Sequence, residues 1–130
     1  HIPRADAGMK AGEWPKNGLT GFELEGKRLG VIGLGRIGAT VARKAVGIGM
    51  EVAAFDPFLP TSAAGRMSVP MKPLDELLAW ADIITLHIPR TKETTNIIGE
   101  AQMRAMRKGS YLINAARGGL VDEDAAAHCT

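Results

Sequence analysis

The sequence has little of three things that would point to particular classes of protein. Among its 130 residues there is one cysteine, Cys129, so an internal disulfide and a metal cluster held by thiolates are excluded. A reduced compartment, the cytoplasm, is therefore expected. No apolar run approaches the roughly 20 residues that a membrane-spanning helix needs, and no signal peptide is visible. We therefore predict neither a membrane partner nor a metal site.

The chain also has no large excess of positive or negative charge. The chain has 16 Lys and Arg against 14 Asp and Glu, a net charge of +2, and the basic residues are scattered. Arg104, Arg107 and Lys108 come closest to a patch, but the pattern places them in the last turn of a helix, where cations suit the helix dipole. No nucleic-acid partner is predicted.

The most informative stretch is 27–56. A short apolar run at 29–34 leads through three glycines into apolar residues at helical spacing, and a second apolar run at 52–55 ends at Asp56. The first and last runs have the length and composition of buried strands, and the middle has the period of a helix. The stretch therefore predicts a strand, a glycine turn, a helix and a second strand.

Each of the three glycines in this turn has a predicted physical role. Gly33 permits a tight turn, Gly35 lets the backbone approach a pyrophosphate, and Gly38 allows the helix to pack closely on the strand. The free N–H groups of Arg36 and Ile37 at the helix start would donate to phosphates. A purely structural turn is the alternative, but the flanking strand, helix and acid favour a dinucleotide site.

Asp56 indicates which dinucleotide. It lies 18 residues beyond Gly38 (56 − 38), close to the roughly 20 typical of the carboxylate that holds the adenosine ribose. A carboxylate accepts hydrogen bonds from both ribose hydroxyls of NAD and repels the additional phosphate of NADP. Residues 57–60 supply no arginine for that phosphate, and Arg66 is the first candidate. The predicted cofactor is NAD.

The remainder of the chain continues the alternation. Strands are predicted at 81–88 and 110–115, and helices at 74–81, 100–108 and 123–128, the last with Asp122 as N-cap. This order predicts an α/β protein with a Rossmann-type, doubly wound parallel sheet in three layers, with the four strands in the spatial order 3-2-1-4. We expect a sheet truncated after about four strands, with 110–115 as a bare apolar edge.

The N-terminal part precedes the first predicted strand. Residues 1–14 have a short helical pattern with an apolar side that must pack either on this domain or on a partner, and a connector follows it. We therefore expect a helix and connector at 1–25 and the nucleotide-binding domain at 26–130, incomplete at its C-terminal side.

Three segments together resemble one family. GLGRIG followed by FDP, then ADIITLHIPRTKETTNIIG, then GSYLINAARGGLVDEDA are similar to the NAD-binding domain of D-2-hydroxyacid dehydrogenases, from residue 1 to about residue 126. In that family the nucleotide domain is inserted into a substrate domain, so the resemblance implies that the substrate domain lies outside this chain.

The resemblance also implies roles for individual residues. Arg117 matches the family's catalytic arginine, which binds the substrate carboxylate and polarises its carbonyl. The cofactor contacts that the resemblance implies are Gly33, Gly35, Arg36, Ile37, Gly38, Asp56, His87, Ile88, Pro89, Ala115, Ala116 and Arg117. One departure is Arg90, which stands where the family usually has an apolar residue.

The chemistry of Arg117 supports its role independently. Open α/β sheets bind ligands beyond the carboxyl ends of their strands, and Arg117 follows the predicted strand 110–115. A guanidinium can hold a 2-keto acid through two parallel hydrogen bonds while it stays charged. The alternative is a surface arginine that closes a turn before Gly118 and Gly119.

The implied function is hydride exchange between NAD and a small 2-hydroxy or 2-keto acid. The family's catalytic histidine and glutamate are expected outside this chain, and His87 is expected to contribute shape and backbone, so the chain alone should bind NAD without catalysis. Alternatives within the same fold are an NAD-sensing transcriptional corepressor and a dehydrogenase acting on formate or phosphite. The family commonly dimerises through this domain, so a homodimer or higher homo-oligomer is expected, and the apolar side of 2–12 would lie either at its interface or in the core of this domain.

Overall fold

The structure is a computed structural model in which residues 1–14, 16–59 and 69–129 are described. None of the described helices is long and apolar enough to cross a membrane. The elements, in chain order, are α1 (Ile2–Lys10), β1 (Arg28–Ile32), α2 (Arg36–Gly47), β2 (Glu51–Phe55), α3 (Leu74–Trp80), β3 (Ile83–Leu86), α4 (Glu100–Ala105), β4 (Tyr111–Asn114) and α5 (Glu123–Cys129).

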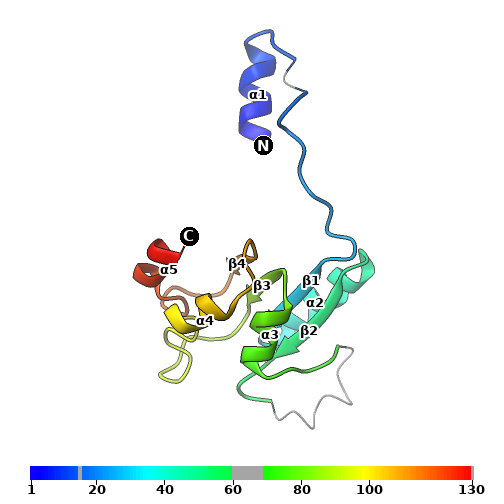
Figure 1. Ribbon diagram of the computed structural model, residues 1–130. Coiled ribbons are helices and arrows are strands. Elements are labelled where there is room, and N and C mark those ends of the chain that lie inside the picture. The colour runs from blue at the N-terminus through cyan, green and yellow to red at the C-terminus, as the bar shows by residue number, and fades with distance from the viewer. Residues whose placement is uncertain (15, 60–68, 130) are drawn as a thin grey trace.

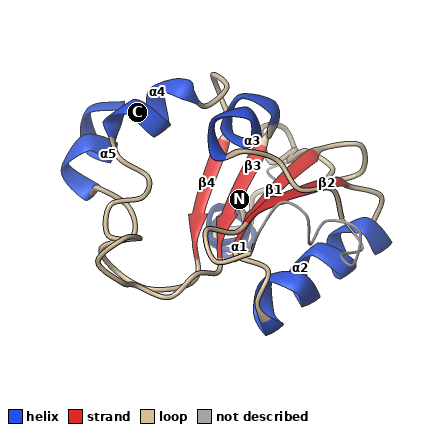
Figure 2. Cartoon of the chain, turned by 90° about the horizontal axis from the view of Figure 1, so that it is seen from below, coloured by secondary structure: helices blue, strands red, loops and turns tan. Residues whose placement is uncertain are grey.

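The four strands form one parallel sheet with helices on both faces. Its order is β2-β1-β3-β4, and every neighbouring pair is parallel. Helix α2 contacts β1 and β2 from one face, whereas α3 contacts the same strands from the other, with α4 packed on α3 and α5 on α4 (Figure 2). The predicted three-layer, doubly wound α/β architecture is confirmed.

Strand alternation divides the core into two clusters, one on each face. Val31 and Val52 belong to the cluster under α2, whereas their neighbours Ile32 and Ala53 belong to the cluster under α3. Because successive side chains of a strand point to opposite faces, a strand covered on both sides is apolar at every position. The continuous apolar runs of β1 and β2 therefore correspond to strands covered by helices on both sides, whereas β4 stays exposed on one side.

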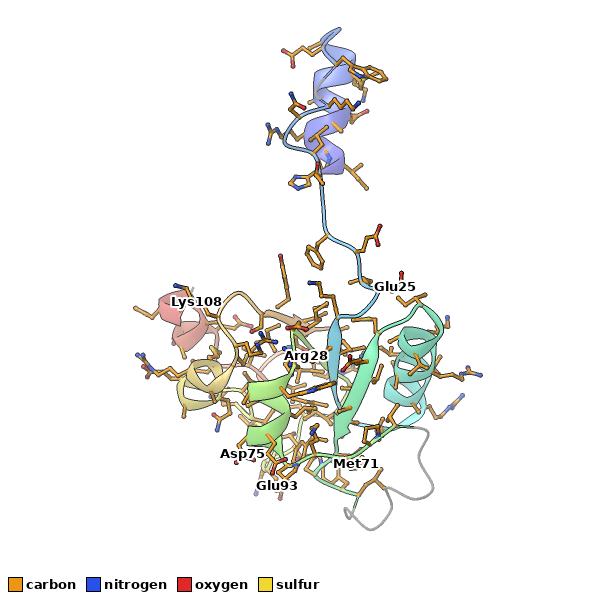
Figure 3. All side chains as sticks on the ribbon, turned by 45° about the vertical axis from the view of Figure 1, so that its right-hand side comes forward. Glu25, Arg28, Met71, Asp75, Glu93 and Lys108 are labelled. Carbon is orange, nitrogen blue, oxygen red and sulfur yellow. The ribbon has the colours of Figure 1, made fainter. Side chains whose placement is uncertain are left out.

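The predicted strand order was wrong, because one extended segment was missed. Of the four predicted strands, the third (β3) lies between the first and the fourth and not beyond the second. Met71, in a segment for which no strand was predicted, makes a parallel bridge with Ala54 of β2 and occupies that outer position (Figure 3). With Met71 counted as a one-residue third strand, the order becomes 3-2-1-4-5, the doubly wound arrangement extended by one strand.

Helix α4 is shorter than predicted. It ends at Ala105, and Met106 has an extended backbone, so Arg107 and Lys108 lie beyond the last turn. Arg107 instead pairs with Asp82 at 2.7 Å, and Arg104 pairs with Glu100 one turn away. The prediction that all three basic residues complement the helix end is therefore correct for Arg104 alone.

Two parts of the chain leave apolar side chains uncovered. Helix α1 stands away from the sheet at the end of an extended connector, and none of its residues is buried (Figure 1). Strand β4 pairs with β3 alone among the described strands, and Tyr111 and Ile113 on it are about half exposed, at 52% and 47%. The expected bare apolar edge at this strand is confirmed.

Asp82 connects the N-terminal ends of three strands, β1, β3 and β4. Its carboxylate accepts the backbone N–H of Arg28 at 3.0 Å, the Arg28 guanidinium at 3.1 and 3.2 Å, and the Arg107 guanidinium at 2.7 Å. Its backbone carbonyl accepts the N–H of Tyr111 at the start of β4. The Arg28 backbone hydrogen bond is the main cause that holds the pKa of Asp82 below its ordinary value, and the Arg28 guanidinium adds to it.

We expect Asp82→Ala to lower the free energy of unfolding by about 1–3 kcal/mol, because charge-assisted hydrogen bonds to two arginines are lost. Urea unfolding at neutral pH measures this. Since the folded pKa is below the ordinary 3.8, the contribution is complete above that pH and is lost as pH falls through the folded value, so wild type and variant should converge in acid. Asp6→Ala, which removes the exposed ion pair with Lys10, is the matched control and should change stability by less than about 1 kcal/mol. Equal effects of the two substitutions would contradict this role of Asp82.

Candidate functional site

A pocket of about 400 Å³ opens where β3 and β4 end. Its lining consists of Ile37, His87, Ile88, Pro89, Arg90, Ala115, Ala116 and Arg117. Every one of these except Arg90 was predicted from the sequence to contact the cofactor. The remaining predicted residues do not line this pocket: Gly33, Gly35, Arg36 and Gly38 form the neighbouring turn between β1 and α2, and Asp56 follows β2.

The glycine turn has the shape that the three roles require. Gly33 has a φ of +96°, and a Cβ there would lie 2.5 Å from Ile88 Cγ2 and 2.7 Å from the His87 carbonyl oxygen. A Cβ at Gly38 would collide with the carbonyl oxygen of Gly33, so the helix approaches the turn directly. At Gly35 the corresponding space is open. A phosphate group can therefore approach the backbone at Gly35.

The N-terminus of α2 supplies donors beside that open space. The first hydrogen bond of the helix runs from the Ala39 N–H to the Gly35 carbonyl at 2.9 Å, so the N–H groups of Arg36, Ile37 and Gly38 precede the helical ladder. Together with the positive end of the helix dipole they form an anion site. This part of the structure fits the pyrophosphate of a dinucleotide.

Asp56 is buried and has two partners of its own. Its side chain is 8% exposed; Oδ2 accepts the N–H of Leu34 and Oδ1 accepts the N–H of Phe58, each at 2.8 Å. A carboxylate has about four acceptor positions, so each oxygen can also accept one ribose hydroxyl. Arg66, the candidate partner for an NADP phosphate, lies outside the described residues.

Sequence reasoning predicted Asp56 as a ligand for ribose and missed the bond to Leu34. That bond connects the end of β2 to the glycine turn after β1, which lies 22 residues earlier in the chain. The predicted pairing of the two strands could have indicated this bond. Neighbouring parallel strands end at the same edge of the sheet, so the acid after β2 lies beside the turn after β1.

His87 extends the edge of β3 towards β1. Its backbone N–H donates to the Ile32 carbonyl at 2.7 Å, and its Nε2 lies 3.0 Å from the buried Thr85 hydroxyl. Burial lowers the pKa of His87, so the imidazole is neutral at neutral pH. These contacts are consistent with the predicted role in shape and backbone, which stays a prediction.

The polar segment after Pro89 fixes the position of that proline. Thr94 is fully buried, donates its hydroxyl hydrogen to the Pro89 carbonyl at 2.7 Å and accepts the Thr91 N–H at 2.8 Å. The Asn96 N–H then donates to the Gly119 carbonyl at 2.9 Å. No element was predicted between 88 and 100, whereas the structure shows a hydrogen-bonded link between the ends of β3 and β4.

Arg117 lies in the turn that follows β4, and hydrogen bonds of the Asn114 side chain stabilise this turn. The Asn114 amide donates to the Arg117 carbonyl at 2.9 Å, and its side-chain oxygen accepts the Ala116 N–H at 3.1 Å. The Arg117 guanidinium is exposed and donates to the Ala116 carbonyl at 2.9 Å. Among the described residues it forms no ion pair, so it can bind an anion in the pocket.

Comparison with known proteins gives one consistent result. Residues 1–129 match the family model described as D-isomer specific 2-hydroxyacid dehydrogenase, NAD binding domain. D-3-phosphoglycerate dehydrogenase of Archaeoglobus fulgidus is 48% identical over 124 residues, and that of Bacillus subtilis is 46% identical over 125 residues. These matches cover 95% and 96% of this chain and 24% of each relative, so the chain spans about a quarter of their length.

Solved structures of related enzymes have the same fold. The pyruvate reductase of Chlamydomonas reinhardtii superposes with a TM-score of 0.88 at 41% identity, over 98% of this chain and 38% of that one. The D-lactate dehydrogenase from Aquifex aeolicus, complexed with NAD and lactic acid, superposes with a TM-score of 0.84 at 38% identity, over 98% and 38% of the two chains.

The double role of Asp56 predicts an unusual response to its removal. We expect Asp56→Ala to weaken NADH binding by about tenfold or more, because both the ribose acceptor and the tether of the glycine turn are lost. NADPH affinity should not rise, since the same turn serves both cofactors. Fluorescence titration, with Trp80 as energy donor, measures both. Glu51→Ala, at an exposed acid on the same strand, is the control and should bind as wild type does. If NADPH affinity rose while NADH affinity stayed unchanged, Asp56 would only repel the additional phosphate of NADP and would not hold the glycine turn.

Proposed function

Because the chain belongs to the D-isomer specific 2-hydroxyacid dehydrogenase family, as its NAD-binding domain, we propose that it serves a D-3-phosphoglycerate dehydrogenase. That enzyme oxidises 3-phosphoglycerate to 3-phosphohydroxypyruvate, the reaction that opens serine biosynthesis. The names of the curated relatives at 46–48% identity support this substrate. The observation that carries the proposal is the pocket in which Ile37 of the anion-binding helix terminus lies beside the exposed guanidinium of Arg117, which forms no ion pair among the described residues.

The cofactor contacts in this proposal follow the geometry of the sheet edge. The N–H groups of Arg36 and Ile37 bind the pyrophosphate beside Gly35, and the carboxylate of Asp56 accepts the hydroxyls of the adenosine ribose. Gly33 and Gly38 keep the turn close to β3 and α2. The bound nicotinamide supplies the carbon that exchanges hydride.

The remaining lining residues divide between the two ends of the cofactor. Ile88 and Pro89, beyond β3, face the adenosine end, and Ala115 and Ala116, beyond β4, lie under the nicotinamide ribose. Arg117 binds the substrate carboxylate through two parallel hydrogen bonds and polarises the neighbouring carbonyl oxygen. Its guanidinium stays charged throughout, so it orients the substrate and does not transfer a proton.

Reduction of a ketone also needs an acid that protonates its oxygen. In the pocket described here the candidate is His87, whose Nε2 is already bonded to Thr85. We therefore assign the proton transfer to residues outside these 130, and we propose that the chain alone binds NAD without turnover. The proposal places the protein in the cytoplasm, as its single cysteine suggests.

A second candidate substrate is a short D-2-hydroxy acid without a phosphate. The solved structures that resemble the chain are named for pyruvate and D-lactate, and they share the same fold at 38–41% identity. The pocket geometry at Arg117 suits any 2-keto acid, because the guanidinium binds the carboxylate that all of them have.

Titration of the chain with NADH and NADPH tests the cofactor site. We expect saturable quenching of Trp80 emission by NADH and binding of NADPH that is weaker by about tenfold or more, because Asp56 repels the additional phosphate. Circular dichroism shows in parallel whether the chain is folded. A folded chain that binds neither nucleotide, or both equally, would contradict the proposed site.

We further propose that a second copy of this chain covers α1. The helix has nine residues, and isolated helices of this length are unstable in water. An apolar groove of about 310 Å³ is lined by Ala5, Met9, Trp14, Lys16 and Leu19, all from α1 and its connector, and Trp14 is 78% exposed. Two copies that pair through this surface would bury the groove and stabilise both helices.

Met9→Glu tests this pairing. We expect the wild-type chain to elute with a mass close to twice 13.8 kDa in size-exclusion chromatography with light scattering, and the variant to elute close to 13.8 kDa, because a carboxylate would be buried in the interface. Lys10→Glu adds the same side chain outside the groove and should leave the mass unchanged. A wild-type chain that is monomeric at high concentration would exclude a homodimer built on α1.

A further inference from the structure

Arg90 brings a second guanidinium into the pocket of Arg117. It follows Pro89 directly beyond β3 and lines the same space as Ala116 and Arg117 beyond β4. Of the residues that line the pocket, Arg90 alone has no proposed contact with cofactor or substrate.

The position of the Arg90 side chain is defined by the turn after Arg117. Gly119 has a φ of +76°, and a Cβ there would lie 2.8 Å from Arg90 Cζ and 2.9 Å from Arg90 Nε. The guanidinium thus packs directly over the space that the missing side chain leaves. On the other side, Thr94 holds the Pro89 carbonyl and so fixes the backbone that carries Arg90.

The charge of Arg90 is not neutralised by its neighbours. Among the described residues its guanidinium makes no hydrogen bond or ion pair, and the pocket lining contains no carboxylate. The nearest acid along the chain, Glu93, is fully exposed, and a hydrogen bond from Thr91 lowers the pKa of its carboxyl. Two guanidinium groups therefore share one pocket of about 400 Å³ without a counter-charge.

We propose that Arg90 is a specificity-determining residue, which binds the second anionic group of a doubly anionic 2-hydroxy acid while Arg117 binds the carboxylate. A monocarboxylate neutralises one of the two guanidinium groups, whereas an acid with a phosphate neutralises both. The planar donor fork of arginine matches the geometry of a phosphate. The inference rests on the proposed function and deepens it, since it names the residue that distinguishes a phosphorylated substrate from an unphosphorylated one.

The test compares D-3-phosphoglycerate with D-glycerate, which differ only in the phosphate. Each acid is titrated into the NADH-saturated chain, and the Nε–Hε signals of Arg90 and Arg117 are followed by NMR. We expect D-3-phosphoglycerate to bind at least about tenfold more tightly and to shift both signals, whereas D-glycerate shifts that of Arg117 alone.

Three variants assign the preference to this side chain. Arg90→Leu should remove the preference and leave the affinities for D-glycerate and NADH unchanged. Arg90→Lys keeps the charge without the fork and should retain part of the preference. Arg43→Leu removes one exposed positive charge from α2, outside the pocket, and should keep the full preference. Circular dichroism and NADH affinity show that each variant is folded.

The outcomes separate this inference from the proposed function. An unchanged preference in folded Arg90→Leu, or no preference in the wild type when NADH is bound, would overturn the role of Arg90 and leave the cofactor site standing. A parallel loss of NADH affinity in Arg90→Leu would also overturn it, because the guanidinium would then serve the cofactor. A folded wild-type chain that does not bind NADH would contradict the proposed function itself.

Discussion

The hydrogen bond from the Leu34 N–H to the carboxylate of Asp56 is the contact on which the candidate site depends. It joins the turn after β1 to the end of β2, and the Phe58 N–H satisfies the other oxygen. A buried carboxylate without such partners would carry a large desolvation penalty. The glycine turn, the start of α2 and the acid therefore form one unit, and the cofactor contacts proposed at its two ends would not be independent of each other.

The sequence was most informative where local and tertiary requirements agree. The apolar runs that became β1, β2 and β3 are almost entirely buried, because both faces of the sheet are covered there. The prediction of the strand order was wrong because it missed Met71, and a single bridged residue has no periodicity by which a sequence pattern could reveal it. The link between Asn96 and Gly119 was equally invisible, because it joins backbone groups, which are the same in every residue.

The side-chain chemistry proposed for Asp56 and Arg90 follows from each residue type, whereas side-chain packing does not. The spacing between the glycines and Asp56 indicated a carboxylate near a ribose, but only the coordinates show that the same group anchors the turn. Arg90 was recognised as an unusual residue, yet its contact with Gly119 depends on how the ends of β3 and β4 are joined. Such contacts lie between segments far apart in the chain, and no single-segment pattern contains them.

The two ends of the pocket are built on strands of different exposure. The glycine turn follows β1, which lies between β2 and β3 and is buried, whereas Arg117 follows β4, whose outward side chains Tyr111 and Ile113 face solvent. Local opening takes place where few apolar contacts are lost. Local opening is therefore expected first at the β4 end, and with the proposed cofactor contacts a dinucleotide would detach at the nicotinamide while the adenosine is still held.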